Sequence, residues 1–195
     1  MLGHSHVVLG WAGVLLAESF ARSRGGSVFG TPLMPFDVSP VLIPSLPLVL
    51  AAAAVGSLLP DLDHPQGALA NYRLVGIPIF KPAAFVAAAV LSHRGPSHSL
   101  LVWTILTALG AYFGASYGIL PLVWAASLGY IVHLAADSLT KAGVPWLWPL
   151  WGRPVGFPPS RSLRIQTGGW IEHGLVLIVL VASLAASASE TITFP

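Results

Sequence analysis

The stretch LPLVWAASLGYIVHLAADSL (residues 120–139) is a run of twenty mostly apolar residues that carries one histidine and one aspartate. A helix needs roughly twenty apolar residues to cross a bilayer, so the stretch predicts a membrane-spanning helix. His133 and Asp137 are four residues apart, which places them on one helical face about one turn from each other. Ionisable groups inside membrane helices are costly and usually functional. The pair therefore predicts two metal ligands, or a ligand and its supporting carboxylate; the alternative is a hydrogen-bonded pair that stabilises helix packing.

The composition of the whole chain also indicates a membrane protein. Of 195 residues, 55% are hydrophobic and 8% are charged, whereas soluble domains carry about 25% charged residues. We expect a single membrane-embedded domain over residues 1–195. The net charge of +2 comes from scattered basic residues, so we expect membrane lipids as partners and no nucleic acid. The chain has no cysteine, which leaves imidazole and carboxylate as ligands for any metal.

Four further apolar segments have the length of membrane helices. They are expected at residues 6–21, 41–59, 97–117 and 170–188. A sixth segment, residues 81–93, is too short to span a bilayer and fits a re-entrant or interfacial helix. The predicted fold is therefore an all-α, polytopic membrane helix bundle with about five transmembrane helices and one short helix.

Chain direction alternates from one span to the next, and with this alternation the polar residues fall at one membrane face. The alternation does not force that outcome, because each group could equally have been at the other end of its helix. Histidines and acids fall at that face in five groups: His4 and His6; Asp61, Asp63 and His64; His93 and His98; His133 and Asp137; Glu172 and His173. The loops of the same face carry most of the basic residues: Arg73, Lys81, Arg94, Lys141, Arg153, Arg161 and Arg164. By the positive-inside rule this face is cytoplasmic, in an inner (plasma) membrane of bacterial or archaeal type.

The motif PDLDH offers Asp61, Asp63 and His64 where the second span breaks. Closely spaced oxygen and nitrogen ligands in a turn can wrap a cation, and one of the aspartates can serve as a general base. The alternative is an Asp-rich turn that simply ends a helix in solvent.

The motif SHRGPSHS places His93 and His98 on either side of a Gly-Pro turn, so that two imidazoles can converge. The helix start after the turn exposes free amides that attract anions, and Arg94 adds a bidentate anion contact. A cation site beside such an anion cradle suits phosphoester hydrolysis. The alternative is an interfacial loop whose histidines only meet water.

Two further helix starts carry candidates. His6 joins the first apolar run and is a better ligand candidate than His4, which precedes that run. Glu172 can be a ligand, a general base or a favourable charge at a helix N-terminus. No partner can be named for His173.

The motifs SHVVLG, GSLLPDLDHP, SHRGPSHSLL, GYIVHLAADSLTKAGVPWLWPL and GGWIEHGL occur in an order that resembles the YdjM-like family. That family is described as predicted inner-membrane, metal-dependent hydrolases, in part LexA-regulated, and the resemblance covers essentially the whole chain. It implies the same polar positions here: His6, Asp61, Asp63, His64, His93, Arg94, His98, His133, Asp137 and Glu172. One departure is LTKAG, where the family often has LTPxG; Lys141 is expected to alter that loop and not the site.

We therefore expect one or two divalent ions, zinc first and manganese, iron or nickel as alternatives. The expected metal ligands are His6, Asp61, Asp63, His64, His93, His98, His133 and Asp137, with Glu172, Arg94 and Asp61 as catalytic residues. The expected reaction is cleavage of an ester or phosphoester of a lipid or lipid-linked substrate by metal-activated water. The alternatives are a divalent-metal transporter or sensor, and a non-catalytic membrane scaffold. The sequence leaves the oligomeric state open.

Overall fold

The computed structural model describes residues 1–29, 46–63, 73–74, 77–78 and 95–192. Within these ranges the fold is helical apart from a two-residue hairpin, as the all-α expectation requires. The helices are α1 (Gly3–Arg22), α2 (Leu46–Leu58), α4 (Leu100–Ser116), α5 (Leu120–Ser138) and α6 (Trp170–Ile192). Three 3-10 turns are η1 (Leu59–Asp63), η2 (Pro96–His98) and η3 (Arg161–Leu163), and the hairpin pairs β1 (Arg73–Leu74) with β2 (Ile77–Pro78).

The expected number of spanning helices needs correction. Each of the five long apolar segments contains one helix, but within the described residues only Leu120–Ser138 and Trp170–Ser189 are long and apolar enough to cross a membrane. Helix α2 has 13 residues and α4 has 17. The run expected at residues 97–117 was counted through η2, and the first residues of the run expected at 41–59 lie outside the described residues. Helix α1 has 20 residues but includes two histidines, a glutamate and an arginine. The short helix expected at residues 81–93 lies outside the described residues.

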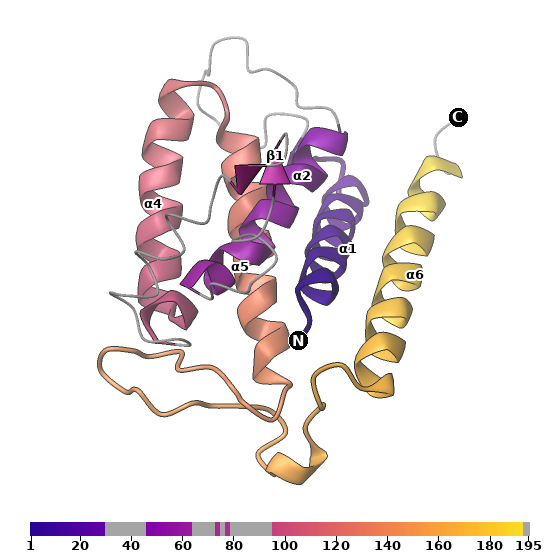
Figure 1. Cartoon of the computed structure of the whole chain (residues 1–195). Helices are drawn as coiled ribbons and strands as arrows, with labels where there is room; N and C mark the ends of the chain where they lie inside the picture. Colours follow the sequence, from indigo (N-terminus) through magenta and orange to yellow (C-terminus); the bar gives the residue numbers. More distant parts are fainter. Residues whose placement is uncertain (30–45, 64–72, 75–76, 79–94, 193–195) are drawn as a thin grey trace.

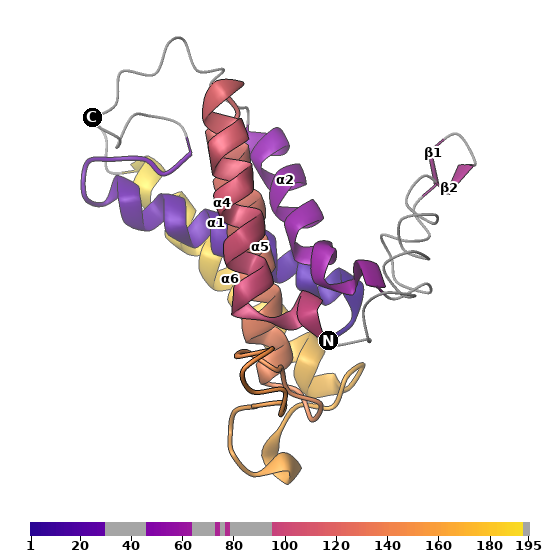
Figure 2. The same ribbon diagram turned by 90° about the vertical axis from the view of Figure 1, so that its left-hand side faces the viewer.

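Helices α1, α2 and α5 form the centre of the bundle, with α6 against α1 and α4 against α5 (Figures 1 and 2). The α2–α5 contact depends on glycine at two positions. A Cβ on Gly56 would collide with the carbonyl of Ala126, and one on Gly129 would collide with the carbonyl of Ala53. Small residues let membrane helices approach this closely, so the two backbones meet almost directly.

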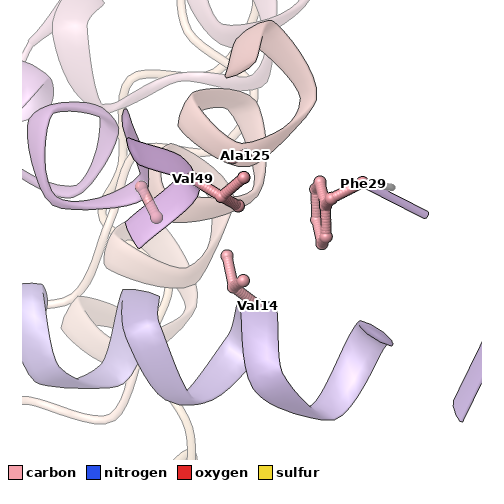
Figure 3. Close-up of a cluster of buried hydrophobic side chains, with 5 residues drawn as sticks. Val14, Phe29, Val49 and Ala125 are labelled. Carbon is pink, nitrogen blue, oxygen red and sulfur yellow. The ribbon is translucent and has the colours of Figure 1, made fainter. Parts of the chain in front are cut away.

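An apolar cluster holds these three central helices together. Val14 from α1, Val49 from α2 and Ala125 from α5 pack with Phe29, as Figure 3 shows, and Ala53 completes the cluster. All five side chains are buried. This packing sets the relative positions of the helices that carry the polar residues.

Four helix ends and one loop lie toward the same end of the bundle. The starts of α1, α4 and α6 and the end of α5 gather there in both views (Figures 1 and 2). The loop that joins α5 to α6 lies below them in Figure 1. The helix ends at which the polar residues were expected to gather therefore lie at one end of the bundle.

Candidate metal centre

Four side chains from three separate elements bring donor atoms close together. The Nε2 atoms of His98 and His133 are 3.4 Å apart. Asp61 Oδ1 lies 3.6 Å from the His98 Nε2 and 3.8 Å from the His133 Nε2. Asp137 Oδ2 lies 4.0 Å and 3.9 Å from the same two nitrogens. We call these four residues the central cluster.

Local structure explains how each member reaches the cluster. His133 and Asp137 are one turn apart on the buried face of α5, as their spacing predicted. Asp61 follows α2 directly in η1, and His98 ends η2. The serine after His98 starts α4, because the Ser99 Oγ accepts a hydrogen bond from the Val102 amide at 3.3 Å, a typical N-cap.

The hydrogen bonds of the two imidazoles leave both Nε2 atoms facing the cluster. The Nδ1 of His133 lies 2.7 Å from the carbonyl oxygen of Ser57. A carbonyl only accepts, so Nδ1 carries the proton and Nε2 keeps its lone pair. The Nδ1 of His98 contacts the Ser97 hydroxyl at 3.1 Å, and the Ser97 carbonyl accepts a hydrogen bond from Tyr130. Metal-binding histidines are typically held in this way through their second nitrogen.

His6 is fully buried beside the central cluster. Its ring stacks on His133, with centroids 3.6 Å apart and an interplanar angle of 17°. Its Nε2 is 3.3 Å from Asp137 Oδ1, yet neither ring nitrogen has a hydrogen bond to any described residue. The α-amino group of Met1 contacts the same Asp137 oxygen. A buried imidazole nitrogen without a hydrogen bond is costly, and a cation beside Asp137 Oδ1 would satisfy one nitrogen of the His6 ring.

These donors fit a divalent metal ion. His6, His133 and Asp137 form one set, and Asp61, His98 and His133 form another, each with ligand atoms within 4.8 Å of one another. Tetrahedral zinc with bonds of about 2.0–2.1 Å needs ligand atoms about 3.3 Å apart. The His98–His133 separation matches this spacing, and the carboxylate oxygens lie slightly farther out. The donor set of imidazole and carboxylate suits zinc and related ions.

Asp61 is ionised at neutral pH. Burial alone would raise its pKa, but a hydrogen bond with the His98 imidazole and electrostatic attraction to His133 and His98 hold the pKa of this carboxyl at about 2. The side chain is also the most accessible of the central cluster, with 24% of its surface exposed. Asp61 therefore offers a charged ligand on the side that solvent can reach.

Glu172 lies at the start of α6 and links it to the start of α1. Its Oε1 accepts a hydrogen bond from the Leu2 amide at 2.8 Å, and its Oε2 accepts one from the Gly168 amide at 2.9 Å. The Ser5 hydroxyl also bonds to it. Of the three roles considered for Glu172, this geometry matches the charge at a helix N-terminus most closely. Its role as a general base stays a prediction.

The other candidates fall outside the cluster or outside the described residues. His64, His93 and Arg94 are not among the described residues, and the Asp63 side chain is not described either. His4 is exposed, and its ring lies 6.0 Å from that of His173.

Three supporting groups were missed by sequence reasoning: the Ser57 carbonyl, the Ser97 hydroxyl and the Tyr130 hydroxyl. Tyr130 had a signal, because it is a polar group inside an apolar run and on the buried face of α5. No side chain in the sequence signals the role of the Ser57 carbonyl, because this group belongs to the backbone. The close approach that brings this carbonyl to His133 is signalled only indirectly, by Gly56 and Gly129.

Comparison with known proteins adds independent information. The family model described as YdjM inner membrane protein matches residues 1–192. The chain is 38% identical over 147 residues to the inner membrane protein YdjM of Escherichia coli (strain K12) and, to the same degree, to that of Shigella flexneri. Each alignment covers 70% of this chain and 65% of the relative, slightly less than two thirds of its length. No solved structure matches the chain.

Proposed function

This chain belongs to the YdjM inner membrane protein family, and from that premise we propose that it is a membrane-bound, metal-dependent hydrolase. Its substrate would be an ester or phosphoester of a lipid or a lipid-linked molecule. The reaction would take place at the cytoplasmic face, where the polar helix ends gather.

One observation carries the proposal: Asp61, His98, His133 and Asp137 converge from η1, η2 and α5 to within 4.0 Å. Three of these side chains are fully buried or nearly so. Buried charges and imidazoles are retained where they are paired or where they coordinate metals. A packing role alone would not require two imidazoles to turn their Nε2 atoms toward the same point.

Each residue has a defined part in this proposal. A divalent ion would supply Lewis acidity that activates water and polarises the scissile ester. His98 and His133 would hold this ion through their Nε2 atoms, with their rings positioned by Ser97 and Ser57. Asp61 and Asp137 contribute the negative charge that holds a divalent cation. Arg94 is proposed to steady the anionic part of the substrate.

The loop from α5 to α6 supports a lipid substrate. Its exposed apolar side chains include Leu150, with 93% of its surface exposed, and Trp151, Phe157 and Leu163. Residues 139–169 also carry four basic residues and no acidic residue. Apolar and basic side chains together favour contact with anionic lipid head groups. The loop lies at the end of the bundle where the helix ends meet (Figure 1), so a lipid head group there would be close to the site.

The proposal is tested first by metal content. Protein purified in detergent is expected to contain a divalent metal, and His133→Ala and Asp137→Asn are expected to lose most of it. His4→Ala is the matched control, because His4 is an exposed histidine of the same helix as His6. Equal, negligible metal in wild type and variants would overturn the proposal.

Hydrolysis is tested on the same proteins. Phospholipids, soluble phosphoesters and acyl esters are offered with added zinc or manganese. The proposal predicts release of product by wild type and by His4→Ala, and little by the two ligand variants. Metal binding without any hydrolysis would favour a metal sensor or transporter instead, and product release that survives both substitutions would contradict the assigned site.

A further inference from the structure

In this arrangement the stacked rings of His6 and His133 are not directed at one ion, although their ligand atoms lie within 4.8 Å of each other. An imidazole binds a metal in the plane of its ring, about 2.0–2.1 Å from the nitrogen. The two rings are 3.6 Å apart and within 17° of parallel, so their planes share no point at bonding distance from both nitrogens. In this arrangement each ring therefore directs a nitrogen toward a different ion position.

The carboxylate of Asp137 lies beside both of these ion positions. Its Oδ1 lies 3.3 Å from the His6 Nε2, while its Oδ2 lies 3.9 Å from the His133 Nε2 and 4.0 Å from the His98 Nε2. The two oxygens of one carboxylate are thus directed to two different imidazole groups. A carboxylate in this orientation is a typical bridge between two cations.

We infer that the centre holds two divalent cations bridged by Asp137, with His6 as a ligand of the second ion. The first ion is held by His98, His133, Asp61 and Asp137 Oδ2, and the second by His6 and Asp137 Oδ1. The inference rests on the proposed metal centre and deepens it.

The surroundings of His6 support the inference independently of the first position. The fully buried His6 ring has no hydrogen bond on either nitrogen within the described residues, and its Nε2 lies 3.3 Å from Asp137 Oδ1. His133 cannot bridge the two ions, because its Nδ1 proton is committed to the Ser57 carbonyl and its Nε2 has one lone pair.

A second ion narrows the substrate class. Pairs of cations about 3.5–4 Å apart occur mostly in enzymes that act on phosphoesters, such as phosphatases and nucleases, and also in aminopeptidases; in phosphoester cleavage they stabilise both the attacking and the leaving oxygen. A bridging carboxylate is compatible with that separation. The inference therefore favours a phosphoester over a carboxylic ester among the substrates of the proposed hydrolase.

Manganese binding tests the inference without relying on activity. Metal-free full-length protein in detergent is dialysed against Mn²⁺, and bound metal is counted per chain. We expect two ions per chain in wild type and an electron paramagnetic resonance spectrum with exchange coupling between neighbouring Mn²⁺ ions. His6→Ala is expected to retain one ion with the uncoupled spectrum of isolated Mn²⁺. His4→Ala is expected to keep both ions and the coupling.

The outcomes separate this inference from the proposed function. One uncoupled ion in wild type would overturn the two-ion centre and leave the proposed metal centre standing. No bound ion in wild type would overturn both. Two coupled ions that persist in His6→Ala would contradict the assignment of His6. If His6→Ala does not fold, the wild-type count and spectrum decide the question alone.

Discussion

The His133 Nδ1 donates to the Ser57 carbonyl oxygen at 2.7 Å, and this hydrogen bond joins α5 to α2. It connects the orientation of a proposed metal ligand to the packing of two helices. The carbonyl reaches the ring because Gly56 and Gly129 let the backbones approach closely. Changes in that packing should therefore alter metal binding without touching a ligand.

Gly129→Ala tests this connection. The added methyl would collide with the Ala53 carbonyl and the Ser57 amide, forcing α2 and α5 apart. Overpacking of this kind costs about 1–3 kcal/mol, and disturbing the groups that orient metal ligands typically costs about 10–100-fold in affinity. We expect lower thermal stability and weaker metal binding in a calorimetric titration. Gly174→Ala on α6 is the control, because a Cβ there meets open space; an equal loss in both variants would contradict the account.

Tyr130→Phe tests the support of His98. The Tyr130 hydroxyl donates to the Ser97 carbonyl, next to the histidine in the chain. Loss of one such hydrogen bond costs about 1 kcal/mol, and metal affinity should fall by about tenfold because the position of His98 is less well defined. Tyr117→Phe is the matched control, since 77% of the Tyr117 surface is exposed. Unchanged metal affinity in Tyr130→Phe would show that this hydrogen bond does not position His98.

Glu172→Gln tests the link between α1 and α6. Both carboxylate oxygens accept backbone amides, and an amide group would turn a donor toward one of them. A buried donor without a partner costs about 1–3 kcal/mol, so the variant should unfold at a lower temperature. His173→Ala, at the exposed neighbouring position, should unfold like wild type. If Glu172→Gln keeps full stability but loses hydrolysis, a general-base role would be favoured instead.

Leu150→Cys tests whether the loop between α5 and α6 contacts lipid. The chain has no cysteine, so a spin label attached there is the single label. We expect the label to be more accessible to oxygen and less accessible to a water-soluble nickel complex than a label on Ser23→Cys. Ser23 lies in the exposed turn after α1. Equal accessibility to the nickel complex at both sites would exclude a lipid contact for Leu150.

Much of the helical fold could be predicted from the apolar runs. The segment predicted at residues 120–139 is α5 (Leu120–Ser138) within one residue, and α6 begins at Trp170 as expected. The helix expected at residues 97–117 was too long because apolarity does not distinguish a helix from the 3-10 turn beside it. His98 lies in such a turn, before α4 begins.

The candidate site could be predicted in its residue types and less well in its geometry. The His133–Asp137 spacing predicted a shared face, since helix periodicity is local. The meeting of His98 with His133, and of His6 with Asp137, depends on packing between helices that are distant in sequence. The stacking of His6 on His133 has no sequence signal, because it follows from the way α1 and α5 pack.

X-ray absorption at the metal edge of purified wild-type protein shows whether imidazoles bind the metal. We expect nitrogen and oxygen ligands at about 2.0–2.1 Å with the outer-shell scattering of at least two imidazoles, and loss of that scattering in a His98→Ala, His133→Ala double variant. Bound metal with no imidazole scattering, or a spectrum unchanged in the double variant, would contradict it.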